Sequence, residues 1–159
     1  MPGESSSLTR GRVAVLVDEF AELEAEATNM AAPAQSTHRI IAALASLGYE
    51  PVELVLREDS IPDWLGRLAS ERFEFAFNLC ETVAGRPEGE HLAAAAVELL
   101  ELPMTGARSR TLLYCLNKDR CAAMLRSHGI QVPDWMLVQR PDQQMEGWDR
   151  FPAIVKPAS

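Results

Sequence analysis

The chain is poor in lysine, with only Lys118 and Lys156 among its 15 basic residues, and its basic residues form no cluster. Nucleic-acid phosphates are bound by clustered lysine and arginine, so this pattern and the net charge of -8 argue against a nucleic-acid binder. The sequence also lacks an apolar run of the roughly 18 residues that cross a membrane, and its polar start lacks a signal-peptide core. We therefore expect a cytoplasmic protein with no membrane partner.

Cysteine is scarce as well, and Cys80, Cys115 and Cys121 form no CxxC pair and no Cys/His ligand pattern. We expect reduced thiols and no metal ligands in this chain. The motifs GxxxxGK[ST], GxGxxG and GxSxG are missing too, which argues against a P-loop, a dinucleotide site and a covalent serine hydrolase. Functional residues are therefore expected at strand ends and in the second part of the chain.

Short, β-branched apolar runs alternate with helical patterns in the first part of the chain. The predicted strands are residues 12–17, 51–56 and 73–78, and the predicted helices are residues 40–47, 61–69 and 88–101. Strands alternating with helices form right-handed βαβ units, so the sequence predicts an α/β fold with a Rossmann-like parallel sheet. In the last helix, the predicted apolar stripe consists of Leu92, Ala95, Ala96, Leu99 and Leu100.

The pattern changes after Gly106. Two further helices are expected at 109–116 and 117–128, and two strands at 135–138 and 153–155. This order predicts an incomplete α+β lobe. The resulting division is a disordered tail (1–11), a Rossmann-like domain (12–110) and the start of a second lobe (111–159).

Both lysines stand where they could meet a phosphate group. Lys118 lies in the first turn of a predicted helix, where a bound anion would be favoured by the free N–H groups and the helix dipole. Lys156 ends an apolar strand and precedes Pro157, which would fix it at the strand exit. The alternatives are a solvated surface lysine for Lys118 and an edge-strand lysine that discourages aggregation for Lys156.

Several segments, taken in order, resemble the D-alanine:D-alanine ligase branch of the ATP-grasp superfamily. They are RVAVLV, ALASLGYEPVEL, FEFAFNLCE, GRPEGE, LLELPMTGA, LNKDRCAAMLRSHGIQVPDW and FPAIVKPAS. The resemblance covers nearly all of residues 12–159. It implies a Rossmann-like pre-ATP-grasp domain followed by part of the ATP-grasp domain.

The same resemblance implies a function. Family members use Mg-ATP to phosphorylate a carboxylate, and an amine then attacks the acyl phosphate to form an amide. Lys118 and Lys156 would contact the ATP phosphates, the substrate would be an amino acid or a peptide, and a homodimer is implied. The family's metal ligands and catalytic core would lie beyond the segments that match, so no catalytic or metal-binding residue is assigned here.

The chain departs from the family after its first strand, where Asp18-Glu19-Phe20 replaces a glycine-rich start and a substrate-binding glutamate. Glu19 is the candidate for holding a substrate amino group, and a solvated acidic loop is the alternative. Glu81 and Glu88 follow the third strand at the edge where doubly wound sheets bind ligands, and they are further candidates. Glu88 could instead complement a helix dipole.

Two classes of function remain open from the sequence. The first is the N-terminal fragment of an ATP-dependent carboxylate-amine ligase, inactive alone and acting on D-alanine, another amino acid or a peptide. The second is a non-catalytic Rossmann-like module for binding or dimerisation, or one half of a split ATP-grasp enzyme. An exposed apolar patch would favour the second class.

Overall fold

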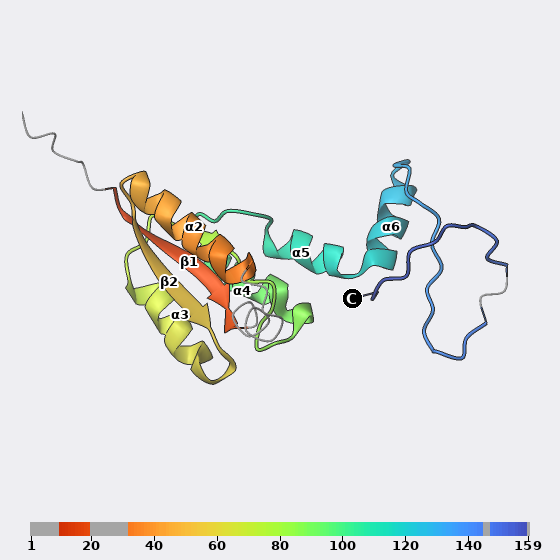
Figure 1. The fold of residues 1–159 in the computed structure, drawn as a ribbon, viewed down its shortest axis with the longest axis horizontal. Helices are drawn as coiled ribbons and strands as arrows, with labels where there is room; N and C mark the ends of the chain where they lie inside the picture. The colour runs from red at the N-terminus through yellow and green to blue at the C-terminus, as the bar shows by residue number, and fades with distance from the viewer. Residues whose placement is uncertain (1–9, 20–31, 145–146, 159) are drawn as a thin grey trace, which may run out of the picture. The chain divides into compact units, whose positions relative to one another are not determined.

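The computed structural model describes residues 10–19, 32–144 and 147–158 (Figure 1). These residues form two compact units, and the boundary along the chain lies between Ser109 and Arg110. Most of the predicted tail, residues 1–9, lies outside the described residues. None of the helices described is both long enough and apolar enough to cross a bilayer.

A parallel three-stranded sheet forms the centre of the first unit. Strand β1 (Arg12–Asp18) lies between β2 (Glu50–Leu56) and β3 (Phe75–Asn78). A single parallel bridge from Ala76 to Met104 extends the sheet beyond β3. The predicted α/β class with a parallel sheet is confirmed.

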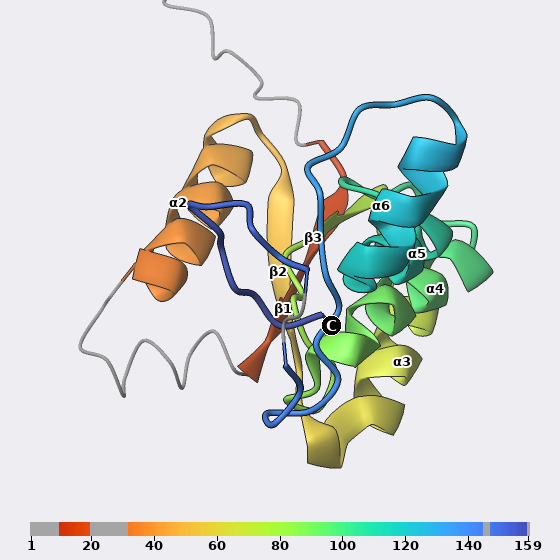
Figure 2. The same ribbon diagram turned by 90° about the vertical axis from the view of Figure 1, so that its right-hand side faces the viewer.

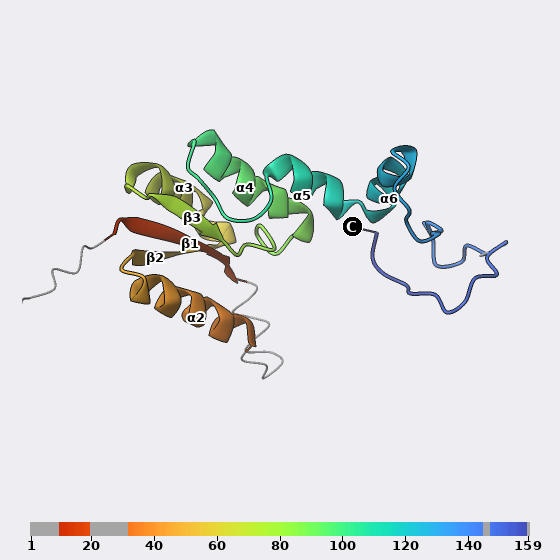
Figure 3. The ribbon, with the colours of Figure 1, turned by 90° about the horizontal axis from the view of Figure 1, so that it is seen from above.

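Three helices cover the two faces of this sheet: α2 (Ala32–Ser46), α3 (Ile61–Ser70) and α4 (Glu90–Leu99). Figures 2 and 3 show α2 on one face and both α3 and α4 on the other. Two short 3-10 turns, η1 (Glu58–Ser60) and η2 (Pro87–Gly89), precede α3 and α4. The connections are βαβ crossovers, as the alternation of patterns predicts.

The central strand is buried on both faces, which explains its continuous apolar run. Val13, Val15 and Val17 point to the α2 face and pack with Leu44. The opposite face holds the larger cluster. Its buried residues are Ala14, Leu16, Leu54, Leu56, Trp64, Leu68, Ala76, Cys80, Val83, Ala93 and Val97.

The apolar stripe predicted for α4 is largely wrong, since only Ala96 of its five residues is among those that pack against the core. The helix buries Ala93, Ala94 and Val97, whereas Leu92 is exposed and Leu99 is 84% exposed. Four consecutive alanines make the helix almost equally apolar all round, so the pattern does not fix which side faces the sheet. Small side chains face the core because they let the helix approach the sheet closely.

A matched pair of substitutions tests this orientation. Val97→Ala is expected to lower the free energy of unfolding by about 1 to 3 kcal/mol, because Val97 is fully buried. Leu99→Ala, two residues along the same helix, is expected to change it by less than about 0.5 kcal/mol. Urea denaturation followed by circular dichroism measures both, and a larger loss for Leu99→Ala would contradict the observed orientation.

The second unit contains α5 (Ser109–Leu116) and α6 (Lys118–Ser127). Both predicted helices are confirmed. Gly129 follows α6 with a φ of +74°, the left-handed conformation that ends a helix.

The strands predicted at 135–138 and 153–155 are wrong, because the structure shows no strand in the described residues after α6. Val155 is 94% exposed, and Ile154 is exposed as well. An apolar segment becomes a strand only when another strand is available to pair with it. No such partner strand lies in the part of this unit that the structure describes.

Candidate functional site

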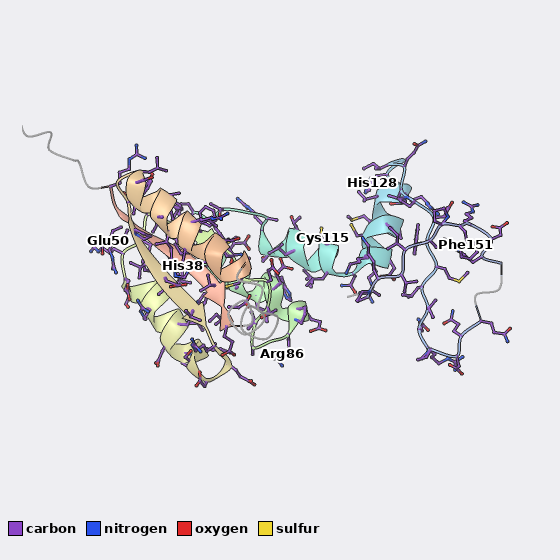
Figure 4. The ribbon with its side chains drawn as sticks, viewed as in Figure 1. His38, Glu50, Arg86, Cys115, His128 and Phe151 are labelled. Atoms are coloured by element: carbon purple, nitrogen blue, oxygen red, sulfur yellow. The ribbon has the colours of Figure 1, made fainter. Side chains whose placement is uncertain are left out.

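The carboxyl ends of the three parallel strands carry the acidic candidates of the first unit. Figure 4 marks the two ends of the sheet: Glu50 lies at the start of β2, and Arg86 lies in the loop after β3. In open α/β sheets, ligands bind at the carboxyl end. Glu19, Glu81 and Glu88 all follow strands at this end or lie in the loop there.

Glu19 follows β1 directly and contacts the end of β2. Its Oε1 accepts a hydrogen bond from the Glu58 amide at 3.4 Å, and its Oε2 lies 3.8 Å from Nη1 of Arg57. The carboxylate is therefore partnered within the protein. A substrate ammonium group at Glu19 would have to compete with Arg57.

The loop between β3 and α4 carries the other two candidates. The side chains of Glu81 and Glu88 are both exposed, and Glu88 lies in the turn η2. Glu90, at the start of α4, is partly buried. Burial raises the pKa of Glu90, the negative charge of Glu81 raises it further, and His91 lowers it.

Asp18 is a further residue at this end of the sheet, and the sequence patterns did not single it out. It ends β1, it is only 2% exposed, and its Oδ2 accepts hydrogen bonds from the amides of Glu81 at 2.7 Å and Thr82 at 3.0 Å. The signal in the sequence is an acid placed directly after a fully apolar strand. The contact with the loop, however, joins residues far apart in the chain.

Two polar atoms near this loop were also missed. Oγ1 of Thr82 and Nδ1 of His91 are buried and have no hydrogen-bond partner among the residues described. Most buried polar atoms in proteins are hydrogen-bonded. No group of three His, Cys, Asp or Glu side chains in the described ranges lies close enough to hold a metal ion.

The three cysteines, all within the described residues, form no disulfide, and of the three only Cys80 is buried. Burial raises the pKa of the Cys80 thiol, and the nearby charge of Asp18 raises it further. Cys80 is therefore a neutral, apolar core residue. Cys115 is exposed, and Cys121 is partly exposed.

In the second unit, the segments that carry the two lysines meet. The amide of Lys118, at the first position of α6, donates a hydrogen bond to the carbonyl oxygen of Ala158 at 3.1 Å. Both lysine side chains are exposed. Asn117 occupies the N-cap position but makes no side-chain hydrogen bond there, so the bond to Ala158 satisfies one of the amides that a helix start leaves open.

Comparison with known proteins finds relatives of one kind, although no family model matches. A D-alanine–D-alanine ligase of Aquifex aeolicus is 29% identical over 116 residues, which are 72% of this chain and 38% of that protein. D-alanine–D-alanine ligase of Nitratidesulfovibrio vulgaris is 32% identical over 90 residues, 56% of this chain and 29% of that protein.

A crystal structure of D-alanine–D-alanine ligase from Bacillus anthracis shares the fold, with a TM-score of 0.55 and 21% identity. The match covers 80% of this chain and 38% of that one. The chain thus spans well under half the length of its relatives. The predicted resemblance is confirmed: the chain is similar in sequence to the N-terminal part of D-alanine–D-alanine ligases and shares their α/β fold.

Proposed function

We propose that this chain forms the N-terminal part of an ATP-dependent carboxylate-amine ligase, in which Lys118 and Lys156 contact the phosphates of ATP. The observation that carries the proposal is the hydrogen bond from the Lys118 amide to Ala158, because it joins the two segments that contain the chain's only lysines. The relatives, all D-alanine–D-alanine ligases, support the same reading. Such an enzyme would act in the cytoplasm.

The charge and exposure of the two lysines suit this role. Both lysine side chains are exposed, so their ammonium groups are accessible to an ATP phosphate. Positive groups that face the transferring phosphoryl group stabilise the charge that develops there. Magnesium would supply further positive charge with ATP, but the described residues offer no cluster to hold it.

The acidic residues at the carboxyl end of the sheet suit binding of a substrate's ammonium group. Glu81 is exposed at the carboxyl end of the sheet, and its charge raises the pKa of Glu90 at the start of α4. Such a negative edge would attract the ammonium group of an amino acid or peptide. We propose Glu81 as the first candidate for that contact and Glu19 and Glu88 as weaker ones, since Glu19 already has Arg57 as a partner.

Calorimetric titration with ATP tests the role of the lysines. Lys118→Ala and Lys156→Ala are each expected to weaken ATP binding by about 10- to 100-fold, because a hydrogen bond to a charged group contributes about 1.5 to 3 kcal/mol. Arg110→Ala is the matched control, since it removes an exposed positive charge from the same unit. If both lysine variants bound ATP as tightly as the control, the proposal would be wrong.

A second candidate function is a non-catalytic module that forms a homodimer, and the exposed leucines of α4 favour it. Leu92 and Leu99 are both exposed on this helix. Exposed apolar patches often mark protein-protein contacts. Sedimentation velocity of the chain and of Leu99→Glu tests this surface, because a dimer that uses it would dissociate in the variant.

A further inference from the structure

The loop after β3 is joined to β1 by side-chain and backbone contacts in direct succession. The Leu79 amide donates to the carbonyl oxygen of Leu16 at 2.8 Å, which continues the ladder between the two strands. The amides of Glu81 and Thr82 then donate to one side-chain oxygen, Oδ2 of Asp18, at 2.7 Å and 3.0 Å. The Asp18 carboxylate therefore extends the pairing of β1 and β3 beyond the end of the sheet.

Because Asp18 is buried, its carboxylate needs these hydrogen bonds from the protein. A buried carboxylate loses its hydration, and hydrogen bonds from backbone amides offset this loss. Asp18 is only 2% exposed, and the two amide bonds supply such partners. The same carboxylate supplies the acceptor that the two loop amides need. Without this acceptor, both amides would have to hydrogen-bond to water, or the loop backbone would have to change conformation.

The second half of the loop is fixed independently of Asp18. The amides and carbonyls of Val83 and Arg86 bond to each other at 3.2 Å and 3.1 Å. Ala84 and Gly85 between them both have positive φ, +52° and +69°, as in a type I′ turn. A Cβ on Gly89 would lie 2.9 Å from Cβ of Val83, so the turn packs tightly against the start of α4. Only the Glu81–Thr82 step depends on Asp18.

We propose that Asp18 is the positioning residue of this site, and that its buried carboxylate fixes the backbone of Glu81 and Thr82 so that Glu81 is held at the carboxyl end of the sheet. Asp18 acts through Glu81 and does not contact a ligand itself. Only the role of Glu81 toward a substrate rests on the proposed function. The placement of Glu81 by Asp18 stands on the contacts alone.

Glu90 reports the position of Glu81 without any ligand. The pKa of Glu90 is raised by burial and, next, by the charge of Glu81. If the Glu81 side chain moves away, this second contribution disappears and the pKa of Glu90 falls. A pH titration of the Glu90 carboxyl carbon by NMR therefore responds to the distance between the Glu81 charge and Glu90.

The experiment compares Asp18→Ala, Glu81→Gln and the double variant in the chain of 159 residues. We expect Asp18→Ala to lower the pKa of Glu90 as Glu81→Gln does, and the double variant to lower it no further. Amide exchange of Glu81 and Thr82 should become at least about tenfold faster in Asp18→Ala, because a charge-assisted hydrogen bond is lost. Exchange in the ladder between β1 and β2 should keep its wild-type rate.

Asp18→Asn is the matched control, because it removes the charge but keeps an acceptor oxygen in the same place. It should leave the pKa of Glu90 close to the wild-type value. If Asp18→Ala does not fold, Asp18→Ser replaces it, since the shorter hydroxyl cannot reach both amides. The proposal is overturned if Glu90 keeps its wild-type pKa in Asp18→Ala, if Glu81→Gln leaves that pKa unchanged, or if the two single effects add in the double variant.

A separate titration with D-alanine as the probe tests the part that rests on the proposed function. Wild-type chain should show NMR shift changes at Glu81, and Asp18→Ala should need at least about tenfold more D-alanine for the same change. If wild type shows no shift changes while the Glu90 result holds, the substrate role of Glu81 is wrong and the positioning by Asp18 stands. If D-alanine binds equally well to both, positioning for the substrate is wrong.

Discussion

Replacement of Leu16 by alanine is expected to lower the free energy of unfolding by about 3 to 5 kcal/mol. Leu16 lies in the middle of the sheet and is fully buried in the cluster on the α3 and α4 face. The loss combines the removed apolar surface with a cavity that the rigid central strand cannot close. Urea denaturation measures this loss. The slope of the free energy of unfolding against urea concentration is compared between the wild type and Leu16→Ala.

The control uses the same substitution where the leucine is exposed. Leu47, which follows α2, is 59% exposed, and Leu47→Ala is expected to change the free energy of unfolding by less than about 0.5 kcal/mol. Similar losses in the two variants would mean that the sheet is not the centre of the stable core. A changed slope would instead mean that the unfolded state had changed.

Trp64→Ala is expected to destabilise the protein by about 3 to 5 kcal/mol. Trp64 is buried between α3 and the sheet, and its Nε1 donates a hydrogen bond to the carbonyl oxygen of Leu54 at 3.2 Å. The variant loses the ring and leaves this carbonyl in a cavity. Thermal and urea unfolding both measure the effect.

Trp64→Phe separates the two contributions, because it keeps most of the apolar surface and removes the donor. Its expected loss is smaller than that of Trp64→Ala and includes about 1 to 3 kcal/mol for the unsatisfied carbonyl. Leu65→Ala, at the next and exposed position of α3, is the positional control with a loss below about 0.5 kcal/mol. Equal losses for Leu65→Ala and Trp64→Ala would contradict the observed orientation of α3.

Strand β1 was predictable because burial on both faces requires apolar residues at consecutive positions. The run from Arg12 to Val17 differs from the observed β1 only at its end, Asp18. The orientation of α4 was not predictable, because alanine contributes little to either side of a helix. The strand at 153–155 failed for another reason: a local pattern does not say whether a partner strand is present.

In the candidate site too, local patterns predicted some features, and contacts between distant parts of the chain determine the others. Lys118 was placed at a helix start from local signals, and the structure has it at the first position of α6. The role of Asp18 depends on amides that lie 63 and 64 residues further along the chain, a contact that no local pattern reveals. Glu19 was predicted to be available for a ligand, but its contact with Arg57 arises from the meeting of two strand ends.

The parallel pairing of β1 has a consequence for how this chain folds. Arg12 pairs with Glu50, and Val13 pairs with Phe75, so the first strand has no nearby partner in the sequence. Such non-local contacts require large loops to close before they stabilise anything, which slows folding. During synthesis, the apolar segment of β1 emerges well before the residues of β3 that complete its pairing. We therefore expect this segment to be the part of the nascent chain that most needs protection from aggregation.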